Sequence, residues 1–136
     1  MNITGEPNGL VIDSNDSRIY WVVKDSIESI RHDGADHKLV AHSLGSPFEL
    51  AIFKDRLYLC EQERQHEVAP SISSVLKYDG SKKIVLKSET GGIWFQDITV
   101  HHSSLQIGKT VFYKQLHLSS EPGVANESLE NSLKVA

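Results

Sequence analysis

Cysteine is almost absent from this sequence of 136 residues, and no stretch of about 18 apolar residues occurs in it. The single cysteine, Cys60, excludes an internal disulfide framework, and the lack of a long apolar stretch excludes a membrane span encoded in this chain. The first ten residues are polar and lack the apolar core of a signal peptide. We therefore expect one ordinary domain. The single cysteine suits either a cytosolic protein or a large secreted β domain that is stabilised by packing alone.

Positive charge is also scarce. The 14 lysines and arginines are outnumbered by 18 aspartates and glutamates, which gives a net charge of −4. Binding to phosphates requires clustered lysine and arginine, so we expect no nucleic-acid partner. Asparagine is rare as well, yet three asparagines begin Asn-x-Ser/Thr sequons: Asn2, Asn15 and Asn126. These residues are candidates for N-glycosylation and favour an extracellular protein.

An internal repeat of about forty residues organises the chain. The matching segments follow the same order in both copies: 7–13 and 47–53, then 17–21 and 55–59, then 26–34 and 73–80. The second copy is longer because it carries an extended loop over 62–71. Repeats of this length are typical of solenoids and propellers.

Each copy is predicted to form four short strands. The first strand, at 10–13 and 50–53, is a short apolar run that suits an inner strand buried on both faces. The pairs Asp33-Gly34 and Asp79-Gly80 predict type I′ hairpin turns, which require positive φ at both central residues. A more polar fourth strand is expected over 37–42, near the edge. Four antiparallel strands per repeat predict a propeller blade, with a β-sandwich as the alternative.

A third copy begins at 94–102 and then loses the pattern, with no Arg-x-Tyr segment and no Asp-Gly turn. Residues 107–118 suit either a further strand pair or an irregular arm. Residues 119–136 are rich in serine, glutamate and asparagine, which predicts disorder, with a frayed helix over 127–135.

Several segments resemble the class B (YWTD) repeats of the low-density lipoprotein receptor family. They are Pro7-Asn8-Gly9-Leu10, Arg18-Ile19-Tyr20-Trp21-Val22, Asp25-Ser26-Ile27-Glu28-Ser29-Ile30 and Pro47-Phe48-Glu49-Leu50-Ala51-Ile52-Phe53. The similarity covers about 3–106 and is closest to the receptors for lipoproteins and vitellogenin. It implies an all-β fold, an incomplete six-bladed YWTD β-propeller with an irregular C-terminal tail.

The resemblance divides the chain into four parts. We expect a first blade with its preceding linker at 1–46, a second blade at 47–92, a propeller-closing strand at 93–106 and a divergent, largely disordered tail at 107–136. In the family an EGF-like module follows, but the tail has no cysteine, so we expect a truncated fragment. The residues assigned to the structural motif are Arg18, Tyr20, Trp21, Gly34, Arg56, Tyr58 and Gly80.

The motif itself departs from Tyr-Trp-Thr-Asp. It reads Tyr20-Trp21-Val22-Val23 in the first copy and Tyr58-Leu59-Cys60-Glu61 in the second. The aspartate, which supports hydrogen bonding between blades in the family, is therefore lost at Val23 and replaced by glutamate at Glu61. The proline that should precede the last inner strand is Phe95.

The resemblance implies a non-catalytic extracellular interaction module of an endocytic receptor, with no cofactor and no membrane insertion by this chain. In relatives such modules lie on the extracellular side of the plasma membrane or in endosomes, take up lipoprotein or yolk-protein ligands and release them in acid. The two histidines that contribute to acid release match Asp25 and Ser46 here, so that switch does not carry over. His42 lies nearby in sequence and is the candidate pH-sensing residue.

Other interpretations also follow from particular residues. Adjacent strand residues point to opposite faces, so His101 and His102 are poor candidates to share a metal. Cys60 lies within a predicted strand, so we expect it to be buried and inert. The aromatic residues Tyr20, Trp21, Tyr58 and Trp94 are expected in the core.

Three alternatives for function stay open. YWTD propellers also serve Wnt co-receptors and matrix proteins. A calcium-dependent propeller hydrolase is the enzymatic alternative, although matching inner-strand ligands are lacking. The third alternative is a chain with no independent function, because an unclosed ring leaves blade faces bare and prone to aggregation.

Overall fold

The computed structural model describes residues 5–62, 69–89, 93–101, 109–117 and 127–135, and within these ranges the regular secondary structure is entirely β-strand. The first sheet contains β1 (Pro7–Asp13), β2 (Arg18–Val23), β3 (Ser26–Arg31) and β4 (Lys38–Ala41). The second contains β5 (Ser46–Phe53), β6 (Arg56–Gln62), β7 (Ser71–Leu76) and β8 (Ile84–Ser88). The third contains β9 (Ile93–His101), β10 (Lys109–His117) and β11 (Glu127–Val135).

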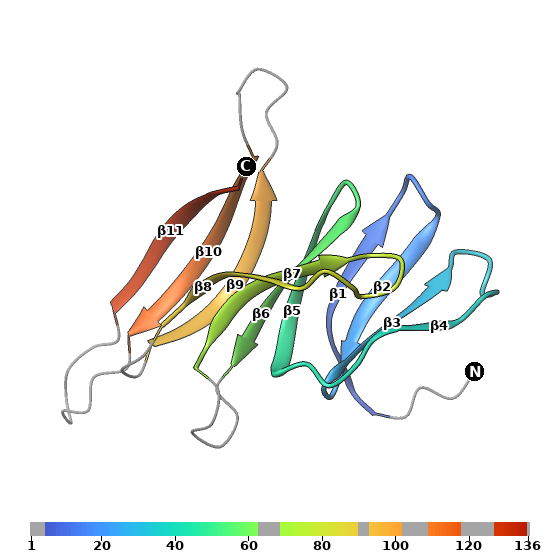
Figure 1. Cartoon of the computed structure of the whole chain (residues 1–136), viewed down its shortest axis with the longest axis horizontal. Helices are drawn as coiled ribbons and strands as arrows, with labels where there is room; N and C mark the ends of the chain where they lie inside the picture. Colours follow the sequence, from blue (N-terminus) through green and yellow to red (C-terminus); the bar gives the residue numbers. More distant parts are fainter. Residues whose placement is uncertain (1–4, 63–68, 90–92, 102–108, 118–126, 136) are drawn as a thin grey trace.

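The three sheets stand side by side along the long axis of the molecule (Figure 1). In each sheet the strands follow chain order and every pairing is antiparallel. β1 contacts β5, and β5 in turn contacts β9, so the first strand of each sheet meets its counterpart. The predicted pair of four-stranded antiparallel blades is confirmed.

Two apolar clusters hold the sheets together. The first joins the first and second sheets and consists of Tyr20, Val22, Ile27, Val40, Ala41, Leu44, Leu50, Leu57, Leu59 and Val75. The second joins the second and third sheets and consists of Ala51, Tyr58, Cys60, Ile72, Phe95 and Ile98. The second sheet is therefore buried on both faces, because alternate residues of each strand point into different clusters.

The first strand of each copy was expected to be buried on both faces, and for β1 this expectation was wrong. Leu10 and Ile12 are 59% and 54% exposed, whereas Leu50, at the position of Leu10 in the repeat, is 5% exposed. The physical reason is the order of the sheets: the second sheet lies between two others, and no described sheet covers this side of the first.

The predicted type I′ turns were also wrong. Gly34 and Gly80 have positive φ, but Asp33 and Asp79 do not. In the first turn the Gly34 amide donates to the Arg31 carbonyl, and in the second the Gly80 amide donates to the carbonyl of Leu76. These hydrogen bonds place each glycine at the end of a longer turn, where a left-handed residue brings the chain back toward the sheet.

The largely disordered tail predicted for 107–136, with a helix over 127–135, was wrong for the described residues. Residues 109–117 and 127–135 form β10 and β11, and β9 pairs with β10 rather than closing the fold alone. Leucines four residues apart, at 129 and 133, suit a helix face, but four is also an even number, so the same spacing suits one face of a strand. Because β11 pairs with β10, residues 127–135 form a strand rather than a helix.

We expect Gly80→Ala to destabilise the protein more than Gly34→Ala. Both glycines have positive φ, which costs an alanine about 1 kcal/mol. A Cβ at Gly80 would also lie 2.5 Å from the Val40 carbonyl oxygen and 2.6 Å from the Ala41 Cβ, whereas a Cβ at Gly34 would meet nothing within 4 Å. Urea unfolding should give a loss of about 3 kcal/mol for Gly80→Ala. Equal losses would mean that Gly80 does not set the spacing between the sheets.

Candidate functional site

Arg18, an expected motif residue, ties three parts of the first sheet together. It lies at the start of β2, and its Nε and Nη2 atoms donate to Ser29 Oγ on β3, at 3.3 and 3.0 Å. Nη2 also donates to the Asp36 carbonyl at 2.6 Å, while Nη1 pairs with Asp36 Oδ2 at 2.7 Å. The guanidinium thus fixes the loop between β3 and β4, using the several donors that arginine alone provides.

Arg56 repeats this arrangement in the second sheet. Its Nε donates to Ser74 Oγ at 3.0 Å, and Nη2 donates to the carbonyls of Ser74 and Lys82, at 3.1 and 2.6 Å. Lys82 and Asp36, whose carbonyls accept from the two arginines, both have a φ of 52°. The sequence repeat located the arginines, but the serine and the left-handed loop residue were missed because neither stands out without the structure.

The motif aromatics are buried, as predicted for Tyr20, Trp21 and Tyr58. Burial raises the pKa of both tyrosine hydroxyls. Trp21 stacks on His37, with ring centroids 5.7 Å apart, and His37 Nε2 lies 2.8 Å from Glu28 Oε2. Cys60 is also fully buried, as expected. The side chain of Trp94 lies outside the described residues.

Glu61 takes the motif's acidic position and is 1% exposed. Its Oε1 accepts from the Gly45 amide at 3.0 Å and from Lys83 Nζ at 2.8 Å. Its Oε2 accepts from the hydroxyls of Ser71 and Ser73. Gly45 lies in the linker between the first two sheets, so the glutamate anchors that linker to the second sheet, and every carboxylate oxygen is satisfied.

Val23 occupies the same position in the first sheet, where it is buried and its side chain has no atom that could accept a hydrogen bond. In the third sheet, strand register reveals a motif copy that the sequence analysis missed. Thr99 pairs with Phe112 as Ala51 pairs with Tyr58, so Phe112-Tyr113-Lys114-Gln115 stands at the motif position.

A buried ion pair bridges the first two sheets. Lys77 follows β7, and its Nζ contacts Asp13 Oδ2 at the end of β1, with both side chains 5% exposed or less. Asp16 Oδ2 lies 2.7 Å from the same Nζ. Asp13 Oδ1 accepts from the backbone amides of Asn15 and Asp16, which shapes the turn after β1. The cation is therefore shared by two carboxylates.

The folded structure lowers the pKa of Asp13 and raises the pKa of Lys77. Burial raises the pKa of Asp13, but the hydrogen bonds from Lys77, Asp16 and Asn15 outweigh it and lower the pKa below the ordinary 3.8. Burial lowers the pKa of Lys77, but the hydrogen bonds with Asp13 and Asp16 outweigh it and raise the pKa above the ordinary 10.5. Both groups stay charged at neutral and endosomal pH, so this junction is not an acid-sensitive switch.

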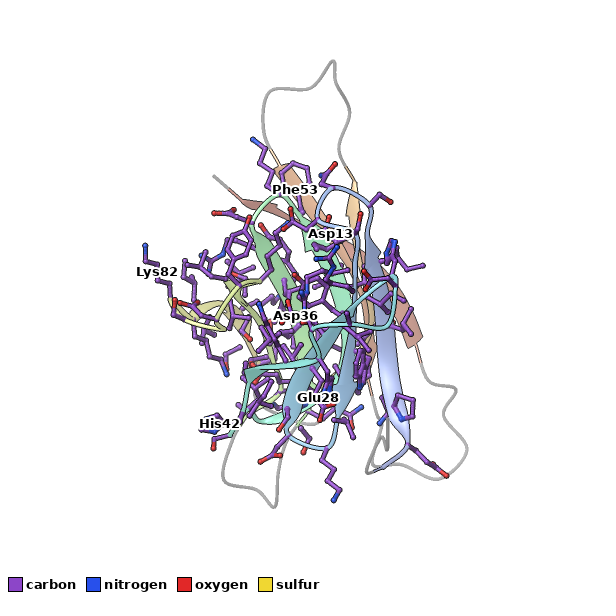
Figure 2. All side chains as sticks on the ribbon, turned by 90° about the vertical axis from the view of Figure 1, so that its right-hand side faces the viewer. Asp13, Glu28, Asp36, His42, Phe53 and Lys82 are labelled. Carbon is purple, nitrogen blue, oxygen red and sulfur yellow. The ribbon has the colours of Figure 1, made fainter. Side chains whose placement is uncertain are left out.

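His42, the candidate pH-sensing residue, is exposed just after β4 and lies 2.9 Å from Ser43 Oγ. It lines a cavity of about 270 Å³ between the first two sheets, together with Val40, Ala41, Ser43, Leu44, Val75, Asp79, Gly80, Ser81 and Lys83. Figure 2 places His42 near one end of the sheets and Asp13 toward the other. The Leu44 amide donates to the Asp25 carbonyl at 3.0 Å, so His42 lies on the linker that contacts Asp25.

Of the sequon asparagines, Asn15 is exposed in the turn between β1 and β2, where an attached glycan would meet solvent. Asn2 and Asn126 lie outside the described residues, as does His102 of the His101-His102 pair. Within the described ranges, no group of three or more histidine, cysteine, aspartate or glutamate side chains could hold a metal ion. A helix of the length and apolarity needed to cross a membrane does not occur there either.

Comparison with known proteins identifies the fold and the family. A solved structure, that of a nidogen–laminin complex, contains a similar fold with a TM-score of 0.66 and 20% identity, covering 93% of this chain and 49% of that chain. No protein-family model matches. The sheets thus have the fold of part of a YWTD β-propeller.

The relatives in sequence agree with this fold. The chain is 38% identical over 60 residues to the vitellogenin receptor of Solenopsis invicta, covering 42% of this chain. It is 31% identical over 106 residues to low-density lipoprotein receptor-related protein 5 of Mus musculus, covering 76% of this chain. The chain spans only 3% and 6% of the length of these two relatives. Together with the fold, these matches show that it belongs to the class B (YWTD) repeat family of low-density lipoprotein receptors.

We expect Asp13→Ala to destabilise the protein by about 3 kcal/mol, because the buried Lys77 then keeps, among the described residues, Asp16 as its single carboxylate partner. Asp33→Ala is the control, since its pair with Arg31 is exposed and such pairs contribute at most about 1 kcal/mol.

The pH dependence of this loss follows from the two pKa shifts. The lowered pKa of Asp13 means that its contribution is fully present above pH 3.8 and is lost as pH falls through the folded value. The raised pKa of Lys77 means that its contribution is present below pH 10.5 and is lost as pH rises further. Urea unfolding should therefore give the same Asp13→Ala loss at pH 5.5 and 7.5. A loss that disappears at pH 5.5 would contradict the assignment.

Proposed function

We propose that this chain is a non-catalytic, extracellular interaction module of an endocytic receptor of the lipoprotein or vitellogenin type. The observation that carries the proposal is the match to a vitellogenin receptor at 38% identity over 60 residues, 42% of this chain. The ionic side chains support it, because each is occupied in holding strands or linkers in place. Arg18 and Arg56 each hold a loop within one sheet. Glu61 and Lys77 hold the junction between the first two sheets. They position a rigid surface for other modules to contact.

The acid response of the proposed module would come from His42. This exposed histidine lines the cavity between the first two sheets, as do Asp79 and Lys83. Lys83 is paired with Glu61, and the Asp79 side chain accepts from the Ser81 amide. Histidine ordinarily gains a proton between the pH of the cell surface and that of the endosome.

A co-receptor or matrix role is the second candidate. It is favoured by the longer match to low-density lipoprotein receptor-related protein 5 and by the similar fold in the nidogen–laminin complex, where a protein partner is bound. Both candidates use the chain as a surface for other proteins, and they differ in the ligand.

Binding to the ligand-binding modules of a vitellogenin receptor tests the proposal. We expect the immobilised chain to bind them about tenfold more tightly at pH 5.5 than at pH 7.4, the range over which histidine side chains in general change charge. His42→Gln should remove this difference, whereas His32→Gln, at another exposed histidine, should retain it. Binding by surface plasmon resonance that is absent at both pH values would reject the endocytic role. Equal acid enhancement in His42→Gln would reject only the assignment of His42.

A further inference from the structure

Asn15 begins an N-glycosylation sequon, Asn15-Asp16-Ser17, in the turn between β1 and β2. The whole turn, 14–17, is exposed. Asn15 shapes this turn through its backbone amide, which donates to Asp13 Oδ1 at 3.0 Å. A group attached to the side-chain nitrogen would therefore leave that hydrogen bond in place. An exposed surface turn accommodates a bulky glycan without disturbing the packing of the sheets.

The sequon lies at one end of the first two sheets. Successive turns of an antiparallel sheet alternate between its two ends. The turns that share an end, which we call the turn end, are 14–17, 32–37, 54–55 and 77–83. Hydrogen bonds join them, because the Ser17 carbonyl accepts from the His32 amide and the Asp55 carbonyl accepts from the Lys77 amide, both at 2.9 Å. Lys77 Nζ also lies 2.7 Å from Asp16 Oδ2, so the sequon contacts the second sheet.

The opposite end, which we call the linker end, contains the turn 24–25 and the linker 42–45. The Leu44 amide donates to the Asp25 carbonyl at 3.0 Å, which ties the linker to this turn. Lys24 and His42 are exposed here. Figure 2 shows the separation of the two ends, with Asp13 toward one and His42 near the other.

The two ends differ in what their side chains do. At the turn end, Arg18 and Arg56 fix the loops 32–37 and 77–83, and Lys77 joins the two sheets. The long polar side chains there are thus engaged within the chain. A glycan at the turn end would cover this surface, because an attached oligosaccharide is bulky and solubilising. Close contact with another protein would then be confined to surfaces away from the turn end.

We propose that Asn15 carries an N-linked glycan and that protein partners contact the linker end. The proposal rests on the extracellular receptor module proposed above, because a chain is N-glycosylated when it enters the secretory pathway. The donor is a lipid-pyrophosphate-linked oligosaccharide. The Asn15 amide nitrogen forms a bond to C1 of its first sugar, the bond from C1 to the pyrophosphate oxygen breaks, the nitrogen loses one proton, and the lipid pyrophosphate leaves.

Site occupancy tests the first part of the proposal. The whole chain is secreted from mammalian cells behind a signal peptide, with Asn2→Gln and Asn126→Gln so that Asn15 begins the one remaining sequon. Peptide N-glycosidase converts a glycosylated asparagine to aspartate, and we expect peptide mass spectrometry to find this conversion at Asn15. Adding Asn15→Gln should give a secreted chain without a glycan. A secreted chain that keeps Asn15 unmodified would overturn the proposal.

Moving the glycan tests the second part. Lys24→Asn gives 24–26 the same Asn-Asp-Ser sequence as the native sequon, but in the turn between β2 and β3 at the linker end. Lys24 has a φ of 55°, a left-handed conformation that asparagine adopts more readily than most residues. Combined with Asn15→Gln, this substitution transfers the glycan from one end of the sheets to the other within an identical sequon.

Surface plasmon resonance then compares lectin-purified glycosylated forms for binding to the ligand-binding modules of a vitellogenin receptor at pH 5.5. The glycan at Asn15 should change Kd by less than about twofold, whereas the glycan of the Lys24→Asn variant should weaken binding at least about tenfold. Enzymatic removal of that glycan should restore binding, which separates its effect from the loss of the lysine charge. Equal effects of the two glycans, or weakening by the Asn15 glycan alone, would overturn the assignment of the linker end. Failure of every form to bind, with Asn15 glycosylated, would reject the receptor role and the assignment of the linker end together, while the glycan site would stand.

Discussion

A blade is a sheet with two apolar faces, and the whole fold depends on covering both of them. The second sheet satisfies this requirement, because Leu57 and Leu59 pack toward the first sheet while Tyr58 and Cys60 pack toward the third. Alternation along a single strand thus supplies residues to two different interfaces. Polar groups then set the geometry of the apolar contacts: the ion pair of Lys77 with Asp13 and the glutamate at Glu61 fix the junction at different places.

The sequence predicted the blades well because their signals are local. Paired strands carry short apolar runs, and the repeat of Arg18-Ile19-Tyr20 as Arg56-Leu57-Tyr58 fixed the register of the second strand in both copies. The turns were harder, since an Asp-Gly pair suits several turn types and only hydrogen bonding by the glycine distinguishes them. The exposure of Leu10 could not be read from its own segment, because burial depends on which sheet comes next.

The third sheet contains a feature that the local sequence pattern did not predict. Its second strand has Phe112-Tyr113-Lys114-Gln115 at the motif position, and only pairing with β9 reveals the correspondence. The contacts of the candidate site could not be predicted from single segments either. Lys77 and Asp13 lie 64 residues apart, and neither is unusual in its own segment, so their pairing could not be predicted. The sequence pointed to His42 only as a neighbour of the family positions, and its place beside a cavity came from the fold.

The long span of the ion pair has a consequence for synthesis on the ribosome. The first sheet is complete once residue 41 has emerged, but the cation that neutralises Asp13 and Asp16 arrives only with Lys77. Domains generally begin to fold from the N-terminus while the chain is still being made. The nascent first sheet therefore carries a carboxylate pair held in water until the second hairpin of the next sheet has formed. The order of translation thus delays the docking of the two blades until most of the second one exists.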